Sequence, residues 1–307
     1  MDSLAVTDQN GVMSRATLMT ITSATLHSTE RPGFVFADYE APQARVTDLG
    51  LTRGDGVFET IGVIDGHPQA LEAHLRRLAH SAALLDLPEP NTDVWRDAIL
   101  AGITDYARRN GSEHEVYAKV IYTRGVEGVS ASSGWVVVDR GEDFTSARAG
   151  IRVVTLDRGY RHDVAQTSPW LLAGAKSLSY AINRAALREA GRRGADDVIF
   201  ISSDGYVLEG PTSSVLILTD QGVVTPKTTL GILAGTTQES AFAFFQSRGY
   251  RTEYREIMAP ELHDARALWL VSSVRQAAPV IALDGTLFSP DRDLTAALND
   301  DLLTPEH

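Results

Sequence analysis

The 307-residue chain contains no cysteine. Disulfide bonds, thiolate nucleophiles and cysteine-based metal sites are therefore excluded, and a reducing cytoplasm is compatible with this composition. The eight histidines do not show the paired spacing that is typical of metal ligands, so no metal site is predicted.

Long apolar runs and an excess of basic residues are also missing. No apolar run approaches the length of about 20 residues that a membrane helix requires, and residues 1–30 lack the basic and then apolar pattern of a signal peptide. The chain has 28 Lys and Arg against 40 Asp and Glu, which gives a net charge of −12. This balance argues against a nucleic-acid or membrane-surface partner, but it allows a local basic pocket for a small anionic molecule. We expect a cytoplasmic protein.

The length suggests about two domains with an ample core. Residues 1–30 are rich in Ser and Thr and are interpreted as an N-terminal extension. The polar stretch 141–150 is the predicted boundary. It separates a smaller α/β domain, residues 31–145, from a larger domain, residues 146–307.

Apolar periodicity predicts alternating strands and helices, and hence an α+β or α/β fold. The predicted strands are 34–36, 57–64, 116–122, 135–138, 151–155, 197–201, 213–218, 251–256, 267–271 and 280–283. The predicted helices are 71–85, 93–109, one that opens at the stretch 172–180 and ends near residue 193, 238–247 and 294–302. Residues 47–56 are predicted as a polar turn and Asp65-Gly66 as a hairpin turn.

The stretch 172–180 contains a lone lysine, Lys176, among small and apolar residues. Leu178 and Ile182 follow at helical spacing, which predicts that the stretch opens an amphipathic helix. Because desolvation favours the neutral amine of a lysine, such a group can attack a carbonyl or hold a cofactor aldehyde. A lysine that extends from a helix start into water is the alternative on the local sequence.

Three further features point to a bound anionic group. Glu209 lies between apolar residues and a glycine, where a buried carboxylate needs a partner, although a structural salt bridge would also provide one. Thr236 and Thr237 begin a predicted helix, where backbone N–H groups and hydroxyls can bind a phosphate or simply cap the helix. Arg77 flanks the apolar stripe of helix 71–85, where it can reach an internal anion or face water. A lysine, an acid, a hydroxyl-rich helix start and an arginine are the groups that pyridoxal phosphate requires.

Ordered motifs in this chain resemble those of the class IV aminotransferases, the pyridoxal-phosphate enzymes of fold type IV. The motifs are GDGVFET at 54–60, HLRRL at 74–78, KSLSY at 176–180, GYVLEG at 205–210 and GILAGTT at 231–237. The family includes branched-chain and D-amino-acid transaminases, (R)-amine transaminases and 4-amino-4-deoxychorismate lyases. The resemblance implies a two-domain fold like that of D-amino-acid aminotransferase and a homodimer.

The resemblance also implies roles for individual residues. Lys176 would form the Schiff base and transfer protons, and Glu209 would pair with the pyridine nitrogen. The other implied cofactor-binding residues are Arg77, Tyr180, Thr236, Thr237, Ser272 and Ser273. Arg124, in the loop 123–134, and Arg275 are the candidates for binding substrate carboxylates. Ser214, Ala234 and Gln238 depart from the residues that are frequent in the family.

The pattern Lys-Ser-Leu-Ser-Tyr is closer to the D-amino-acid transaminase and lyase branch than to the branched-chain enzymes. The sequence therefore favours 4-amino-4-deoxychorismate lyase, which forms 4-aminobenzoate and pyruvate for folate biosynthesis from a small anionic amine. A transaminase acting on D-amino acids, branched-chain amino acids or (R)-amines is the alternative. A pyridoxal-phosphate-binding module without catalytic activity is the alternative outside the enzymes.

Overall fold

The computed structural model describes residues 16–28 and 32–305, which form two compact units. The first unit contains the described residues up to Glu142 and the segment Lys176–Ser179; the second contains Asp143–Ala175 and Tyr180–Pro305. The predicted larger domain included the lysine segment, but Lys176–Ser179 packs with the first unit. The predicted extension 1–30 lies partly outside the described residues. The predicted domain limits otherwise stay a prediction.

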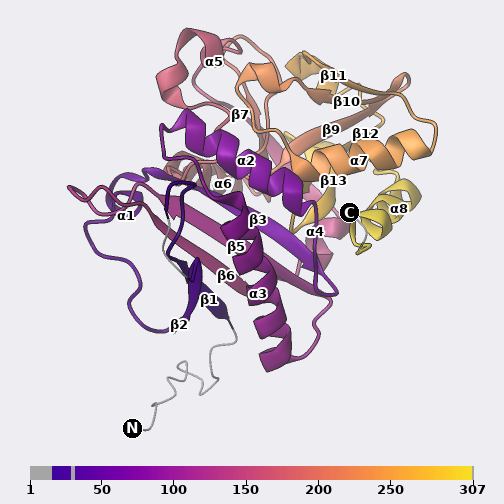
Figure 1. Cartoon of the computed structure of the whole chain (residues 1–307). Helices are drawn as coiled ribbons and strands as arrows, with labels where there is room; N and C mark the ends of the chain where they lie inside the picture. Colours follow the sequence, from indigo (N-terminus) through magenta and orange to yellow (C-terminus); the bar gives the residue numbers. More distant parts are fainter. Residues whose placement is uncertain (1–15, 29–31, 306–307) are drawn as a thin grey trace. The chain divides into compact units, whose positions relative to one another are not determined.

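The first unit is built on a six-stranded antiparallel sheet with the strand order β2-β1-β6-β5-β3-β4 (Figure 1). The strands are β1 (Thr17–Ile21), β2 (Phe34–Ala37), β3 (Gly56–Ile64), β4 (His67–Pro68), β5 (Glu115–Thr123) and β6 (Ser133–Arg140). The predicted strands 34–36, 57–64, 116–122 and 135–138 are confirmed, and Asp65-Gly66 joins β3 and β4 as a hairpin. Strand β1 was not predicted, because its five residues lie in the segment interpreted as an extension.

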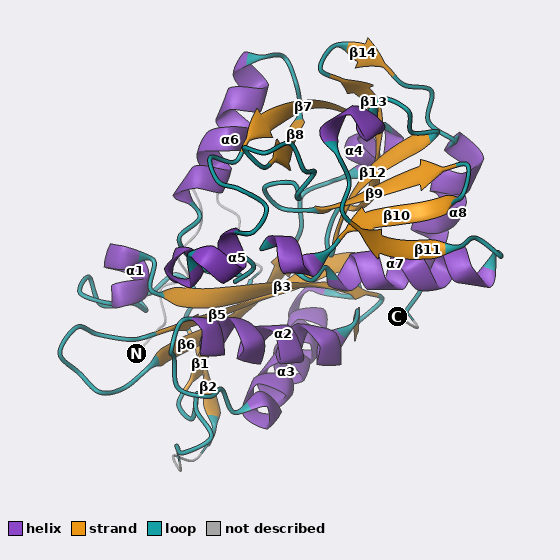
Figure 2. Ribbon diagram, turned by 90° about the horizontal axis from the view of Figure 1, so that it is seen from above, coloured by secondary structure: helices purple, strands orange, loops and turns teal. Residues whose placement is uncertain are grey.

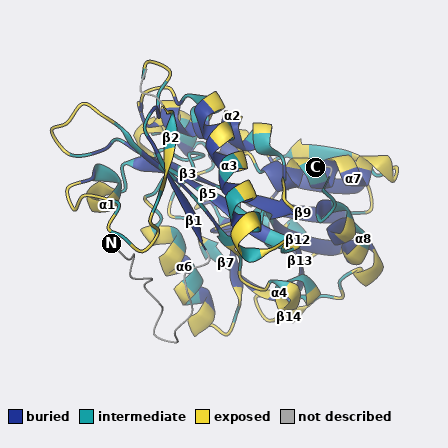
Figure 3. Cartoon of the chain, turned by 60° about the horizontal axis from the view of Figure 1, so that its bottom comes forward, coloured by how far each residue is buried: buried dark blue, intermediate teal, exposed yellow. Residues whose placement is uncertain are grey.

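Two predicted helices pack against this sheet. α2 (Leu71–Leu84) packs on β3, and α3 (Thr92–Asn110) packs on β1 and β6. Alternate residues of β3, namely Val57, Ile61 and Val63, are completely buried, as expected for a strand with one covered face. Figure 3 shows these strands as a buried layer beneath helices whose outer faces are exposed.

The lysine segment is extended rather than helical, which corrects the prediction. The backbone N–H of Phe58 donates to the carbonyl of Lys176 at 3.0 Å, and the N–H of Leu178 donates to the carbonyl of Gly56 at 2.8 Å. The following helix, α6 (Ala181–Arg192), begins only at Ala181. The segment pairs with β3, so its backbone groups are satisfied by the strand and it does not need to be helical.

Residues 47–56, predicted as a polar turn, contain the short helix α1 (Leu49–Arg53). Asp48 caps this helix by accepting from the backbone N–H of Gly50 at 2.8 Å. Gly54 ends the helix with a φ of 68°, a left-handed conformation that glycine adopts without strain. An acidic N-cap and a terminal glycine therefore define a helix where only a turn was expected.

The second unit is built on a sheet with the order β11-β10-β9-β12-β13-β7-β8, and β14 pairs with β13 (Figure 2). The strands are β7 (Ile151–Asp157), β8 (Asp197–Ile201), β9 (Ser214–Thr219), β10 (Gly222–Pro226), β11 (Thr252–Arg255), β12 (Ala267–Ser272), β13 (Gln276–Leu283) and β14 (Thr286–Leu287). All six strands predicted for this region are confirmed, and β10 and β14 were not predicted. The pairs β7–β8, β7–β13 and β10–β11 are parallel, and the other pairs are antiparallel.

Helices of the second unit surround this sheet. Besides α6 they are α4 (Thr145–Ala149), α5 (Val164–Thr167), α7 (Thr236–Ser247) and α8 (Arg292–Leu302), with the short 3-10 helices η1 (Pro169–Leu171), η2 (Thr228–Leu230) and η3 (Ala259–Leu262). Phe245 of α7, Leu298 of α8 and Trp269 of β12 share one apolar core cluster. This core packs α7 against β12 and α8. In the described ranges, no helix is long and apolar enough to cross a membrane.

Candidate active site

In the first unit, α2 and β3 bring together a buried cluster of three charged or titratable residues, Glu59, His74 and Arg77. Arg77 Nε donates to Glu59 Oε1 at 2.7 Å, and Arg77 Nη2 donates to Oε2 at 2.7 Å. His74 Nδ1 lies 2.7 Å from the same Oε2. Glu59 and His74 are each 1% exposed and Arg77 is 8% exposed. The guanidinium predicted to bind phosphate is therefore already held by a carboxylate of the chain.

The charge states in this cluster follow from its burial and its pairing. Burial alone would raise the pKa of Glu59, but the adjacent Arg77 and His74 outweigh it and hold the pKa well below its usual range. Burial lowers the pKa of His74 in spite of the opposing effect of Glu59. At neutral pH, Glu59 is therefore a carboxylate and His74 is a neutral imidazole that donates from Nδ1.

The backbone of Lys176 is held by the same helix. Lys176 N–H donates to Ser81 Oγ at 3.1 Å, and Ser81 lies one turn beyond Arg77 on α2. The ammonium Nζ lies 4.6 Å from the centre of the Phe58 ring, and the side chain is half-buried. The first unit thus fixes the backbone of the predicted Schiff-base lysine beside the predicted phosphate-binding arginine.

Arg124 makes contacts that were not predicted. Its Nε donates to Asp55 Oδ2 at 2.6 Å and its Nη2 to Asp55 Oδ1 at 3.1 Å. Its guanidinium also donates to the carbonyls of Leu85 and Asp86, at the C-terminal end of α2. These contacts connect the β5–β6 loop to the turn before β3. A role in binding a substrate carboxylate stays a prediction.

In the second unit, the N-terminus of α7 gathers three hydroxyl groups. The hydroxyls of Thr236 and Thr237 each lie 3.4 Å from Ser273 Oγ. The N-cap is Gly235, which has no capping side chain, so the alternative that a threonine caps the helix is wrong. A Cβ at Gly235 would lie 2.3 Å from Ser214 Oγ, so a larger residue here would require the Ser214 side chain to move. A hydroxyl-rich helix N-terminus is suited to bind a phosphate.

Glu209 is half-buried, where full burial was predicted. Its Oε2 accepts from the backbone N–H of Leu233 at 3.0 Å. The nearby Tyr180 donates its hydroxyl to the carbonyl of Pro211, which also accepts from Asn183 Nδ2. Burial and the charge of Glu209 raise the pKa of Tyr180 to about 12. The phenol is therefore protonated at neutral pH and remains a donor.

The turn between β12 and β13 carries the last three predicted residues. Ser272 ends β12, Ser273 lies in the turn, and Arg275 Nη1 donates to the buried Asp197 Oδ2 at 2.6 Å. Arg275 Nε and Nη2 are covered by protein atoms and have no hydrogen-bond partner among the described residues. Arg148 of α4 donates to the carbonyl of Arg275 at 3.0 Å and fixes the turn. Substrate binding by Arg275 stays a prediction.

The sequence prediction missed the partners of the charged residues. Glu59 alternates with Val57 and Ile61 on β3, so a period of two already placed a carboxylate on a buried face. Asp55 and Asp197 gave no such signal, because an acid beside a turn or at a strand start is usually exposed.

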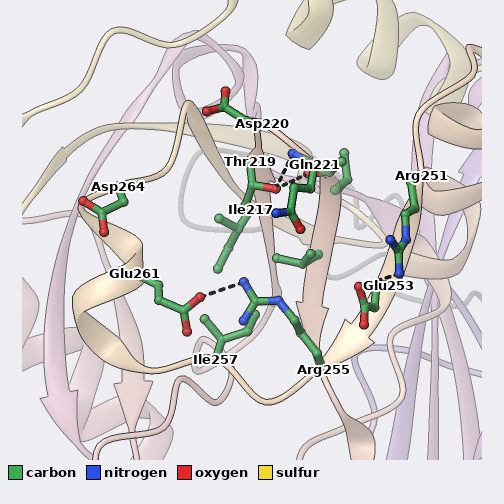
Figure 4. Close-up of a pocket in the computed structure, with 13 residues that line it drawn as sticks. Ile217, Thr219, Asp220, Gln221, Arg251, Glu253, Arg255, Ile257, Glu261 and Asp264 are labelled. Atoms are coloured by element: carbon green, nitrogen blue, oxygen red, sulfur yellow. Dashed lines mark hydrogen bonds and ion pairs between the residues drawn. The ribbon is translucent and has the colours of Figure 1, made fainter.

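The cavity of Figure 4 has no connection with the predicted site residues. It has a volume of about 550 Å³, lies in the second unit beside β9, β10, β11 and η3, and none of the predicted site residues lines it. Its Arg255 pairs with Glu261 at 2.7 Å and its Arg251 with Glu253 at 3.4 Å. In the described part of the chain, no group of three or more His, Asp or Glu residues could hold a metal ion.

Comparison with known proteins identifies relatives of this chain by sequence and by structure. Residues 56–283 match the family model for amino-transferase class IV. The bifunctional aminodeoxychorismate lyase / D-amino acid transaminase of Mycobacterium tuberculosis is 45% identical over 253 residues, which cover 80% of this chain and 87% of that protein.

Two solved structures are similar along almost the whole chain. The fold IV-transaminase CpuTA1 from Curtobacterium pusillum has a TM-score of 0.91 and 69% identity, and the match covers 94% of this chain and 99% of that chain. A hypothetical aminotransferase from Mycobacterium tuberculosis, in its PLP-bound form, has a TM-score of 0.86 and 40% identity, with coverage of 94% and 100%.

Proposed function

Because this chain belongs to the class IV aminotransferase family, we propose that it is an aminotransferase whose amino donor is a D-amino acid. Enzymes of this family have fold type IV and use pyridoxal 5'-phosphate as cofactor. Two relatives with different degrees of identity both carry the name transaminase, one of them together with the name lyase. Transfer of an amino group is therefore the activity that these two names have in common.

The residues of each unit fit the cofactor. The N-terminus of α7 offers backbone N–H groups and the hydroxyls of Thr236 and Thr237, which suit a phosphate dianion. Arg77 offers a cationic group that is held in one orientation by Glu59. Glu209 offers a carboxylate for a pyridinium proton, and Lys176 offers an amine. The observation that carries the proposal is that Ser81, one turn beyond Arg77 on α2, accepts from the backbone N–H of Lys176, so that the first unit holds the lysine against the helix that carries the arginine.

When bound, pyridoxal phosphate supplies an aldehyde for the substrate amine and a ring that withdraws electrons from the carbon bearing nitrogen. With the cofactor bound, the amine Nζ of Lys176 would remove the proton from that carbon and deliver it to the cofactor carbon that carried the aldehyde. In this proposal, Glu209 would keep the ring nitrogen protonated and so the ring electron-poor. Arg77 of the first unit and Thr236, Thr237 and Ser273 of the second would each offer donors to the phosphate, and Ser272 and Tyr180 would line the cofactor.

The amino donor is tested with the purified holoenzyme. We expect D-alanine and 2-oxoglutarate to give pyruvate and glutamate of the D configuration, with L-alanine as the matched control donor. L-Leucine and an (R)-amine test the other donors of the family. Transfer from L-leucine or the (R)-amine, but not from any D-amino acid, would overturn the assignment of the donor.

4-Amino-4-deoxychorismate lyase is the second candidate, because the relative at 45% identity carries both names. The lyase substrate has two carboxylates, whereas Arg124 and Arg275, the two predicted receptors, pair with Asp55 and Asp197. Supplying aminodeoxychorismate without a keto acid tests this activity. Formation of 4-aminobenzoate and pyruvate would establish the lyase, and its absence would leave the transaminase alone.

Two further features belong to the proposal. The family resemblance supports a homodimer, which light scattering of the purified protein would test. A cytoplasmic location, which the cysteine-free composition allows, would be tested by cell fractionation.

A binding module without activity would show the visible absorbance of bound cofactor but no transfer from any donor.

A further inference from the structure

Glu59 is a buried carboxylate of the first unit. The proposed reaction assigns no function to it. It lies on β3 between Val57 and Ile61, and it is 1% exposed. Both of its oxygens accept from Arg77, at 2.7 Å each, and Oε2 also lies 2.7 Å from His74 Nδ1. The carboxylate thus occupies the whole Nε and Nη2 edge of the guanidinium.

Stability alone is a weak reason for such an arrangement. A buried ion pair is desolvated on both sides, and apolar residues of similar volume often replace one without loss of stability. A bidentate contact fixes the plane and the direction of the guanidinium, which no apolar pair can do. We therefore infer that the contact with Glu59 serves to orient the Arg77 guanidinium rather than to stabilise the fold.

The same helix face links this orientation to the lysine. His74, Arg77 and Ser81 follow one another on α2 at spacings of three and four residues, so they lie on one side of the helix. Ser81 accepts from the backbone N–H of Lys176. A guanidinium fixed on α2 is therefore also fixed relative to the backbone of the lysine, and both lie in the first unit.

We propose that Glu59 is a positioning residue that orients Arg77 to bind the cofactor phosphate at a set place relative to Lys176. This inference rests on the proposed function, which assigns the phosphate to Arg77. Glu59 acts through Arg77 and does not touch the reacting atoms. His74 supports it by donating to the same carboxylate.

The charge of Glu59 and its orienting contact have opposite expected effects on phosphate binding by Arg77, which makes the inference testable. The negative charge of Glu59 weakens the attraction of Arg77 for a phosphate, so removing the charge would tighten binding if charge alone mattered. Removing an orienting contact would weaken binding. The substitution Glu59→Gln therefore has opposite expected signs under the two explanations.

The experiment measures dissociation constants of pyridoxal phosphate and of pyridoxal, which lacks the phosphate, for the full-length apoenzyme. For E59Q we expect binding of pyridoxal phosphate to weaken by about 10- to 100-fold, because a charge-assisted contact is lost. Binding of pyridoxal should change less than about twofold, because Arg77 has no phosphate to meet. The ³¹P resonance of the bound phosphate should shift as well, which a purely structural role would not require.

A second variant and a matched control complete the test. E59D keeps the charge but shortens the side chain, so it isolates orientation, and it is expected to weaken binding of pyridoxal phosphate in the same direction. It also carries the test if E59Q does not fold. E72Q removes a carboxylate that pairs with Arg96 on the exposed side of α2, and it should leave both dissociation constants unchanged.

The outcomes separate this inference from the proposed function. Tighter binding of pyridoxal phosphate by E59Q, or equal losses for pyridoxal and pyridoxal phosphate, would overturn the positioning role. R77K tests the phosphate assignment itself. If R77K binds both molecules as the wild type does, the assignment of Arg77 fails. If R77K loses pyridoxal phosphate while E59Q and E59D do not, only the role of Glu59 fails.

Discussion

The two clusters of predicted cofactor-binding residues are built by different means. In the first unit, Arg77 is sealed against Glu59 and His74, and each of the three is at most 8% exposed. In the second unit, Thr236, Thr237 and Ser273 gather neutral hydroxyls at a helix N-terminus; the two threonines are as buried as Arg77, at 6% and 8% exposed, and Glu209 is half-buried. A buried charge needs a charged or strongly polar partner from the protein, whereas a buried hydroxyl can be satisfied by another hydroxyl. The two clusters therefore differ in charge rather than in burial: the first contains its own counter-charge, and the hydroxyls of the second are neutral.

The lysine gives the largest expected effect, because nothing in either cluster can replace its amine. Lys176→Ala should lower kcat by a factor of about 1,000 or more, since the proton-transfer group is lost. Transaminase assays with excess cofactor measure this change. Lys227→Ala is the control, because Lys227 lies near Glu256 and outside both clusters. Activity within tenfold of the wild type would contradict the assignment of Lys176.

Arg77→Met should show the cost of breaking the sealed cluster. The variant leaves the Glu59 carboxylate buried without its main partner, so the free energy of unfolding should fall by about 3–5 kcal/mol. Arg96→Met, which breaks an exposed pair with Glu72, should change it by less than about 1 kcal/mol. Urea unfolding of the two apoproteins measures the difference. Equal effects would show that the burial of the first cluster does not matter.

Glu209→Gln should affect catalysis more than stability, because the carboxylate is half-buried. We expect kcat to fall by about 100-fold, since the ring would no longer be kept protonated. The free energy of unfolding should stay near that of the wild type, which urea unfolding measures. A large loss of stability with little loss of kcat would make Glu209 a structural residue.

Lowering the pH should reduce the contribution of Glu59 to the stability of the folded protein. The pKa of Glu59 is lower in the folded protein than in the unfolded chain, because Arg77 and His74 favour the carboxylate. Its stabilising contribution is therefore complete above the unfolded pKa of about 4.3 and is lost as the pH falls towards the folded value. The difference in Tm between the wild type and Glu59→Gln should shrink as the pH falls from about 5 to about 3. A difference that does not depend on pH would contradict this ionisation.

The smallest effect is expected at the hydroxyl cluster. Thr237→Val keeps the shape of the side chain but removes one donor, so binding of pyridoxal phosphate should weaken by about five- to tenfold. Ser240→Ala removes a hydroxyl one turn further along α7 and should leave the affinity unchanged. Equilibrium dialysis of the two apoproteins measures the change. Equal affinities for both variants would exclude Thr237 as a phosphate ligand.

Much of the fold could be predicted from periodicity alone. The alternation in β3 and the apolar stripe of α2 identify both elements, because each has one buried face. The segment at Lys176 was predicted as helical for the same reason and is extended instead. Its conformation is decided by backbone pairing with Gly56 and Phe58, which lie more than 100 residues earlier in the chain. The helix propensity of a short stretch contains no information about a pairing partner so far away in the sequence.

The sequence by itself determined which chemical groups are present: one lysine in an apolar stretch, an acid before a glycine, and two threonines at a helix start. These groups pointed to pyridoxal phosphate, and the ordered motifs around them carried the resemblance to the family. Only the tertiary structure decided which charges are already neutralised by the protein. Arg77, Arg124 and Arg275 look alike in the sequence, but each pairs with a different acid, and only folding brings that acid near; for Arg77 and Arg275, which are largely buried, such a partner is required.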